Sequence, residues 1–330
     1  MGIVGITKAA LRTGCHPPVW KHTSGAVIVK PGKEDDTRLK SYRMISLLSF
    51  IGKSIEKVVA EQQSNKAEKR APLSDGPFGS RNKRSAINAA AIMVDRSHSA
   101  WNEENIAGVL VMDIKAVFPS VVRGRLIQAM KATRIDGDLI PWTKTFLSAR
   151  TVDIVVQGKV LQSHSVEAGV PQGLFPIHNA GLIQLVEERV QATSLCLIGD
   201  LGWVATGKDV NQVVKKLEAC AVESIEWANR EDLQFDTVKM DAALFTYSRG
   251  QKKHLGPKLT TKITVGKGII RFSKQATWWL GVWMDAHLMF KEHHNHCREK
   301  AQAAEAQLRV LITMHGIVPE RVLGFHIACV

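Results

Sequence analysis

Apolar residues in the middle of the chain gather in short runs that predict a buried sheet. Residues 106–112 are almost continuously apolar and end at Asp113. A short run without alternation is typical of a strand that is covered on both faces. Residues 195–205 contain two more apolar runs, on either side of Gly199 and Asp200, and this arrangement predicts a strand–turn–strand unit. The pattern therefore predicts a central sheet with acidic residues at the ends of its strands.

Helices and further hairpins are predicted around this sheet. Asp209 and Gln212 have the spacing of a capping box and open a helix whose apolar residues recur at helical intervals. The apolar segment 42–51 leads into a helix that runs past Val59. Other helices are expected at 85–97, 123–133 and 141–148 and in a last segment that stops at Gly316, and strands at 25–29, 152–156, 160–166, around Leu244 and over 279–282. Helices and hairpins mixed in one chain predict an α+β fold.

Composition narrows the class of protein. The 330 residues are 45% hydrophobic and 23% charged, values of an ordinary globular protein rather than of a disordered chain. No apolar run approaches the roughly 18–20 residues of a membrane span. Residues 1–11 lack the small-residue cleavage site of a secretion signal. The five cysteines are odd in number and scattered, which argues against a disulfide framework. We therefore expect an intracellular protein, nuclear or cytoplasmic, with no membrane partner and no secretion.

The charge is unevenly distributed along the chain. The formal net charge is +13. Residues 1–100 carry 17 basic and 8 acidic side chains, residues 101–240 carry 14 and 17, and residues 241–330 carry 13 and 6. A basic protein suits a polyanionic partner, and an acidic centre between basic ends suits an enzyme that binds phosphates around a carboxylate site. Uneven charge on a solvated surface explains the same counts, so the charge alone leaves both interpretations open.

Two aspartates are candidates for a metal site. Asp113 ends the predicted buried strand, and Asp200 lies at the turn of the predicted hairpin. Carboxylates on rigid strands can hold Mg²⁺ ions that orient phosphates during an in-line displacement. Aspartates are also common at strand ends and turns without any function, and the two residues by themselves leave that alternative open.

Nine short motifs follow one another along the chain. They are Trp20-Lys21, Val29-Lys-Pro-Gly-Lys33, Ser41-Tyr-Arg-Met-Ile-Ser-Leu-Leu48, Phe78-Gly-Ser-Arg81, Val111-Met-Asp-Ile-Lys-Ala-Val-Phe118, Ala168-Gly-Val-Pro-Gln-Gly173, Leu197-Ile-Gly-Asp-Leu201, Leu233-Gln-Phe-Asp-Thr-Val-Lys239 and Trp279-Leu-Gly281. In this order the series resembles the reverse transcriptases of non-long-terminal-repeat, LINE-like retrotransposons of the kind found in fungi. The resemblance covers the chain from about Val19 to its C-terminus.

The resemblance implies a right-hand polymerase of fingers, palm and thumb with an antiparallel palm sheet. Residues 1–104 would form a fingers-like segment, residues 105–285 the palm with part of the fingers around 167–182, and residues 286–330 the start of a truncated thumb. The implied activity is RNA-directed DNA polymerisation by two-metal nucleotidyl transfer, with Mg²⁺ or Mn²⁺ as cofactor. The implied partners are an RNA template, a DNA primer or RNA–DNA duplex, and deoxynucleoside triphosphates. Endonuclease and RNase H portions would be missing.

The resemblance also implies roles for individual residues of the palm. Asp113 matches the first metal-binding aspartate of the family, and Asp200 matches the second member of its Asp-Asp pair. Phe118 matches the steric gate that excludes the 2′-hydroxyl of a ribonucleotide; an ordinary core aromatic is the alternative. Lys239 matches a lysine proposed to protonate the pyrophosphate leaving group.

Nucleotide-binding roles are implied for other positions. Arg43 and one of Lys30 or Lys33 would contact the incoming triphosphate, although each of these cations could also be a solvated surface charge. Arg81 is a further, similar candidate. Gln172 and Gly173 match the loop that lies against the template and the nascent base pair, where glycine allows close backbone approach.

One departure from the family pattern falls on the predicted metal site. The family carries two adjacent aspartates at the hairpin, and here Gly199 stands in the position of the first. At most Asp113 and Asp200 then remain to hold two divalent ions, and the loss of a carboxylate should slow the reaction on the order of 10³-fold. We therefore expect a degenerate and inactive copy of an RNA-directed DNA polymerase domain. The alternative function is that of a catalytically dead remnant that binds nucleic acid. Gly199→Asp is the change that would restore the family's carboxylate.

A second departure follows Gly173. The family usually continues with Ser-Pro-x-Ser-Pro, whereas this chain continues with residues 174–180 as if a short piece were deleted. Met240-Asp241 also replaces the Thr-Glu that the family favours. The deletion is expected to disturb the entry to a palm helix, and a chain that does not fold stably is a third possibility.

Three other clusters carry weaker signals. The sequence His293-His-Asn-His-Cys297 looks like a set of metal ligands, but adjacent residues diverge around a helix axis; a solvated helix is the expected alternative. The tryptophans at 278, 279 and 283 could stack on bases, although core packing is the commoner role. Cys15 and His16 are expected to lie in a loop.

Overall fold

The computed structural model describes residues 3–30, 37–38, 41–70, 85–133, 135, 137, 139–156, 158–170, 172–247, 262–265, 268–273 and 276–315. The helices are α1 (Ile3–Thr13), η1 (Pro18–Trp20), α2 (Phe50–Arg70), α3 (Ala86–Asn102), α4 (Val117–Ser120), α5 (Arg123–Ala132), α6 (Leu139–Leu147), η3 (Gln172–Leu174), α7 (Phe175–Val190), α8 (Val210–Arg230) and α10 (Lys291–His315). The strands are β1 (His22–Val29), β2 (Tyr42–Leu47), β3 (Ile106–Asp113), β4 (Arg150–Val156), β5 (Lys159–Val166), β6 (Thr193–Leu197), β7 (Asp200–Gly207), β8 (Asp241–Phe245), β9 (Lys262–Val265), β10 (Gly268–Arg271), β11 (Ala276–Trp279) and β12 (Val282–Asp285). This mixture confirms the predicted α+β class.

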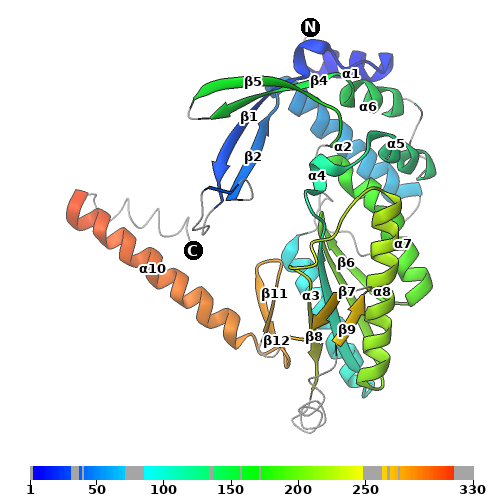
Figure 1. The fold of residues 1–330 in the computed structure, drawn as a ribbon, viewed down its shortest axis with the longest axis vertical. Helices are drawn as coiled ribbons and strands as arrows, with labels where there is room; N and C mark the ends of the chain where they lie inside the picture. Colours follow the sequence, from blue (N-terminus) through cyan, green and yellow to red (C-terminus); the bar gives the residue numbers. More distant parts are fainter. Residues whose placement is uncertain are drawn as a thin grey trace.

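A four-stranded antiparallel sheet forms the centre of the lower half of the molecule in Figure 1. Its strand order is β6-β7-β3-β8, and β3 pairs with β7 on one side and with β8 on the other. The predicted strand at 106–112 and the predicted strand–turn–strand unit around Gly199 are both confirmed. Since β3 is flanked by strands on both sides, its backbone hydrogen bonds are satisfied within the sheet.

Helices cover both faces of this sheet. Helix α3 packs against β3, β6 and β7 on one face, and α8 packs against β3 and β7 on the other, with α7 beside it (Figure 1). Leu110 and Met112 of β3 belong to the core under α7 and α8, whereas Val109 and Val111 belong to the core under α3. The continuous apolar run therefore arises because alternate residues of β3 enter two different hydrophobic layers.

A second sheet lies in the upper half of the molecule (Figure 1) and has the strand order β2-β1-β4-β5. The hairpin predicted at 152–166 is confirmed, with Gly158 at a positive φ of 76° in its turn. Strand β1 pairs antiparallel with β2 and parallel with β4, which joins residues more than 120 positions apart. The sequence offers no local signal for this parallel pairing.

The helix predicted to follow the apolar segment 42–51 and to run past Val59 is confirmed as α2. Residues Tyr42–Leu47 form strand β2 on β1, and the helix begins only at Phe50. The side chain of Ser49 accepts a hydrogen bond from the backbone N–H of Gly52 at 3.1 Å, which stabilises the first turn of α2. The apolar segment before the helix is a strand, because pairing with β1 supplies the backbone partners that a strand needs. The sequence pattern predicts neither α1 nor the β9–β10 hairpin.

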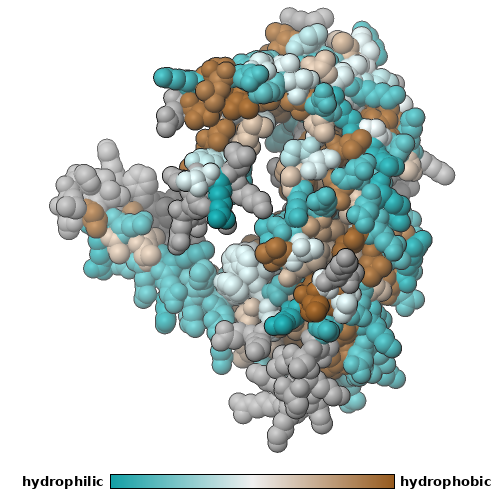
Figure 2. Space-filling view, viewed as in Figure 1, coloured by the Kyte–Doolittle hydropathy of each residue, from teal (hydrophilic) through white to brown (hydrophobic). Residues whose placement is uncertain are grey.

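Apolar side chains remain exposed on the β1–β2 hairpin. Figure 2 shows a hydrophobic area over the upper sheet, which includes this hairpin, and a hollow between the upper sheet and the lower half of the molecule. The residues with exposed large apolar side chains on these strands are Ile28, Val29, Met44, Ile45 and Leu47. Among the residues that the structure describes, no helix combines the length and the apolar character needed to cross a membrane.

The last part of the described chain is the β11–β12 hairpin followed by α10, which packs on β12. The core interpretation of the tryptophans is confirmed for Trp279, which is buried, and is wrong for Trp278, which is 42% exposed. The rings of Trp278 and Trp283 lie 5.1 Å apart, and the ring of His296 on α10 packs edge-on against both. The predicted last helix is confirmed to His315, and its predicted end at Gly316 lies outside the described residues. The division of the chain at residues 104 and 285 stays a prediction.

The segment after Gly173, where a disturbed entry to a palm helix was expected, packs closely. The short helix η3 passes directly into α7, and the side chains of Leu174 and Phe175 are fully buried. Ile177, Leu182 and Val186 continue this buried face of α7. The connection between η3 and α7 therefore brings apolar residues into the main core.

Phe175→Ala should lower the free energy of unfolding by about 3–5 kcal/mol, because it empties a fully enclosed aromatic site. Urea denaturation measures the loss. Val238→Ala is the matched control, since Val238 is 91% exposed, and it should change stability by less than about 0.5 kcal/mol. Equal effects of the two substitutions would contradict the packing of the shortened segment.

Candidate active site

The pairing of β3 with β7 brings two aspartates together. Asp113 is the last residue of β3, Asp200 is the first residue of β7, and the two are directly opposite each other in the antiparallel register. Side chains of directly opposed residues lie on the same face of a sheet, with Cβ atoms about 4.5–5.5 Å apart. The side chain of Asp113 is 22% exposed, and Asp200 is exposed. Two carboxylates therefore lie side by side at one end of the central sheet.

A lysine from a distant segment joins the two carboxylates. The ammonium group of Lys239 donates a hydrogen bond to Oδ2 of Asp113, and it also lies 3.9 Å from Oδ2 of Asp236. The backbone holds this segment in place, because the N–H of Asp236 donates to the carbonyl of Asp113 at 2.7 Å. The structure thus brings together Asp113, Asp200 and Lys239, three residues that the sequence analysis selected.

Asp236 is a charged member of the cluster that the sequence analysis did not select. It pairs with Lys239, three residues later in the chain. Its place within the motif that ends at Lys239 was the available signal. Because one motif carries both members of an ion pair, its acidic residue could have been selected together with its lysine.

The charges of the cluster influence one another. Desolvation by the surrounding protein, and then the negative charge of Asp113, raise the pKa of Asp200. The hydrogen bond from Lys239 to Asp113 raises the pKa of Lys239, so this side chain stays a cation at neutral pH. The two carboxylates therefore repel each other, and the positive charge of Lys239 offsets part of this repulsion.

The residues present do not fit a pair of divalent ions. The described part of the chain contains no group of three or more His, Cys, Asp or Glu side chains arranged to hold a metal ion. Lys239 already engages one oxygen of Asp113. The carbonyl of Gly199 is also occupied, since it accepts the backbone N–H of Ile114 at 3.1 Å. Mg²⁺ prefers six oxygen donors and usually takes one or two of them from carboxylates. Asp113 and Asp200 therefore suit a single ion better than a pair of ions.

The hairpin turn that precedes Asp200 is held from below. Ile198 adopts a positive φ of 62°, which is uncommon for a β-branched residue. The buried thiol of Cys196 donates to the carbonyl of Ile198 at 3.3 Å, and the side-chain amide of Asn179 on α7 donates to that sulfur at 2.9 Å. Desolvation first, and then Asp200, raise the pKa of Cys196 to about 12, so the thiol keeps its proton. Helix α7 thereby positions the turn that carries Asp200.

Two other predicted residues lie near the start of α7. The ring of Phe118 packs edge-on against the ring of Phe175, with centroids 6.2 Å apart. Gly173 lies so close to α2 that a Cβ atom there would come within 2.7 Å of the Cβ of Ala60. Glycine is therefore needed for contact with α2, whatever lies on the other side. Gln172 is the first residue of η3.

The predicted triphosphate-binding cations are on the other sheet. Arg43 is exposed on β2, opposite Ile28 of β1, and Lys30 directly follows β1. The structure thus places Lys30 and Arg43 on one hairpin, on a different sheet from Asp113 and Asp200. Lys33 and Arg81 lie outside the described residues.

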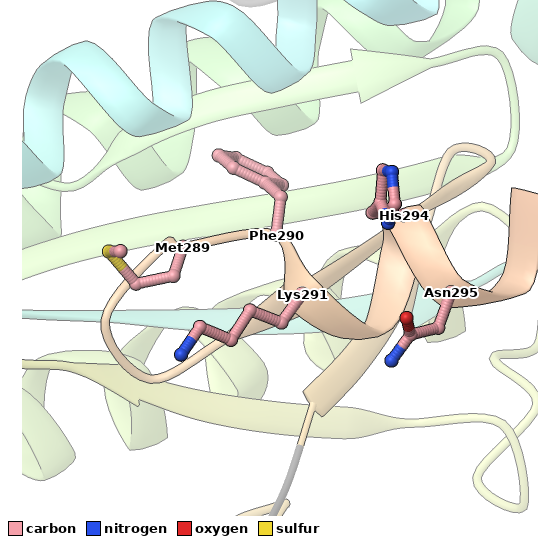
Figure 3. A pocket seen from close by; sticks show the side chains of 5 residues that line it. All are labelled: Met289, Phe290, Lys291, His294 and Asn295. Atoms are coloured by element: carbon pink, nitrogen blue, oxygen red, sulfur yellow. The ribbon is translucent and has the colours of Figure 1, made fainter.

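A surface pocket lies at the start of α10. Figure 3 shows that it is lined by the loop after β12 and the first turn of the helix. Its lining residues are Met289, Phe290, Lys291, His294 and Asn295. None of these residues belongs to the carboxylate cluster. On the same helix, His293 and His296 are half-exposed, and His294 and Cys297 are exposed. The ring of His296 packs against the β11–β12 hairpin, which carries Trp278 and Trp283.

Comparison with known proteins gives one family match and several relatives. Residues 28–283 match the family model described as reverse transcriptase (RNA-dependent DNA polymerase). The chain is 24% identical over 318 residues to a probable RNA-directed DNA polymerase from transposon BS of Drosophila melanogaster, covering 93% of this chain and 34% of that protein. It is also 24% identical over 308 residues to the RNA-directed DNA polymerase from mobile element jockey of Drosophila funebris, covering 88% and 32%. The chain thus spans about a third of the length of these curated relatives.

A solved structure shares the fold. Apo telomerase from Candida tropicalis, truncated from its C-terminal domain, aligns with a TM-score of 0.54 and 13% identity, over 87% of this chain and 57% of that one. This likeness concerns the fold alone, and it confirms the predicted right-hand polymerase fold with its antiparallel palm sheet. The relatives described above come from Drosophila, and the expected fungal type stays a prediction.

Lys239→Gln should make the candidate site bind Mn²⁺ about tenfold more tightly, which corresponds to roughly 1.4 kcal/mol. The reason is that the ammonium group competes with a metal ion for Asp113. Isothermal titration calorimetry measures the affinity. Unfolding stability should change by less than about 1 kcal/mol, because Lys239 is 63% exposed.

The matched control for this prediction is Lys215→Gln, which removes the same charge from an exposed position of α8. Equal changes in Mn²⁺ affinity for both variants would show that Lys239 acts only through the overall charge of the protein.

Proposed function

Because the chain belongs to the reverse transcriptase (RNA-dependent DNA polymerase) family, we propose that it is the RNA-directed DNA polymerase domain of a LINE-like retrotransposon. The observation that carries the proposal is the in-register pair of Asp113 and Asp200, with Lys239 beside it, at the end of the central sheet. The names of the Drosophila relatives support the same assignment. The net charge of +13 suits a nucleic-acid partner.

The proposed partners are an RNA template, a DNA primer or RNA–DNA duplex, and deoxynucleoside triphosphates. Lys30 and Arg43 on the β1–β2 hairpin, with Lys33 and Arg81, are the candidates to bind phosphate groups. Phe118 lies in the short helix α4, five residues after the end of β3 at Asp113. It is the candidate for a bulky ring that restricts the sugar of a nucleotide. Gln172 and Gly173 are the candidates for contact with the template. Lys239, as a cation beside Asp113, is a candidate to protonate the leaving pyrophosphate.

The proposed cofactor is Mg²⁺ or Mn²⁺, which in this type of reaction neutralises charge on the phosphates. Because the donor set does not fit two ions, we propose that nucleotidyl transfer in this copy is slowed on the order of 10³-fold relative to a complete site. Asp113 and Asp200 are the residues that would hold an ion. The surfaces that bind nucleic acid do not depend on position 199.

A second candidate function is a catalytically dead domain that binds RNA or RNA–DNA duplex. The glycine at position 199 favours it, since this residue contributes no carboxylate. The two candidates share fold and partners and differ only in the chemical step. We also propose an intracellular location, nuclear or cytoplasmic. Endonuclease and RNase H activities, if the element uses them, would come from outside these residues.

Binding and chemistry should separate in a direct test. The chain should bind a fluorescent RNA–DNA hybrid, with an affinity that falls as salt rises, when measured by anisotropy. With Mg²⁺ or Mn²⁺ its primer extension on an RNA template should not exceed that of Asp113→Ala. Asp113→Ala should leave hybrid affinity unchanged within about threefold, because a single carboxylate near bound phosphates has a small effect on binding.

Two results would contradict these proposals. Extension by the natural chain that Asp113→Ala abolishes would show that two aspartates suffice for catalysis, and would overturn the proposed slowing of nucleotidyl transfer rather than the polymerase assignment. Hybrid binding that is weak and insensitive to salt would argue against a nucleic-acid-binding domain of either kind.

A further inference from the structure

Gly199 is buried at the turn between β6 and β7, and the space beside it is occupied. A Cβ atom added to Gly199 would overlap the Cγ2 methyl of Val117. The Cβ and Cγ1 atoms of Val117 would lie 3.4 and 3.6 Å away, at ordinary contact distance. A single methyl group therefore accounts for the obstruction, and the side chain that bears it is on another element.

Val117 has little freedom to move aside. It is the first residue of α4 and follows Ala116, which has a left-handed φ of 47°. The N–H of Ser120 donates to the carbonyl of Ala116 at 3.1 Å and closes the turn. The side chain is half-buried and packs against the main hydrophobic core. A β-branched side chain also has few accessible rotamers, so rotation of Val117 does not easily clear the space.

We infer that Val117 is a positioning residue that keeps position 199 without a side chain, so that a carboxylate can return there only when residue 117 becomes smaller. Gly199 and Val117 then form a matched pair, since the methyl groups of Val117 fill the volume that a side chain at 199 would need. The inference deepens the proposed polymerase function, on which its consequence for metal binding rests. It also changes the expectation from the sequence, in which Gly199→Asp by itself restores the site.

A steric test separates this pair from any effect of charge. Gly199→Ala adds only the overlapping atom and should lower the melting temperature by about 3–10 °C, in the range expected for overpacking. In a Val117→Ala background the same substitution should cost nothing, because the obstructing methyl is gone. Gly124→Ala is the matched control: nothing lies within 4 Å of a Cβ at Gly124, so its effect should be the same in both backgrounds. Equal effects of Gly199→Ala in both backgrounds would overturn the inference.

The functional test uses Gly199→Asp alone and together with Val117→Ala. The double variant should show a larger rise in melting temperature with Mn²⁺ than the natural chain, and should extend a primer at least tenfold faster than Gly199→Asp. Gly199→Asp alone should show the same rise in melting temperature with Mn²⁺ as the natural chain. Extension by Gly199→Asp at the rate of the double variant would overturn the inference.

The two proposals fail in different ways. Suppose that Gly199→Ala is destabilising only in the Val117 background, and that the Gly199→Asp, Val117→Ala double variant binds Mn²⁺ but extends no primer. The Val117 inference then holds and the polymerase proposal fails. If Gly199→Asp alone extends primers and Gly199→Ala has the same effect on the melting temperature in both backgrounds, the polymerase proposal holds and the Val117 inference fails.

Discussion

The antiparallel pairing of β3 with β7 is the constraint on which the candidate site depends. It places Asp113 opposite Asp200 and fixes the Gly199 turn beside them. A shift of one residue in this register would turn one aspartate to the opposite face of the sheet. The register is well specified, because alternate residues of β3 enter two separate hydrophobic layers and every position but the last is buried. The hydrophobic core and the position of the carboxylates are therefore determined together.

The residues around Asp113 and Asp200 fit a site that contains these two carboxylates and no side chain at position 199. Lys239 balances charge at Asp113, Gly199 contributes a carbonyl to Ile114, and Val117 fills the space beside the glycine. A site from which a carboxylate had simply been removed would leave a space at the turn. At Gly199 the Cγ2 methyl of Val117 occupies the space that a side chain would need, so the glycine and the packing around it are two parts of one arrangement. Cavities cost stability, which gives a physical reason for such a match.

The same logic applies to the segment after Gly173. Its shortened sequence suggested a disturbed palm, yet Leu174 and Phe175 are fully buried and α7 starts without an intervening loop. Helix α7 also supplies Asn179, whose side-chain amide donates a hydrogen bond to the Cys196 sulfur next to the turn of the candidate site. The connection therefore provides both the packing of α7 and the support of the turn.

Local patterns in the sequence determined the central strands, the hairpin at Gly199, the capped helix α8 and the α+β class. Each rests on contacts between near neighbours or on burial, which the order of apolar residues records directly. The sequence also indicated Asp113, Asp200 and Lys239 through their motifs. The tertiary structure alone decided the strand β2, the parallel pairing of β1 with β4, the contact of Gly173 with α2 and the overlap between Val117 and a side chain at 199. These features join residues far apart in the chain, and no local periodicity specifies which distant partner a strand or a methyl group will meet.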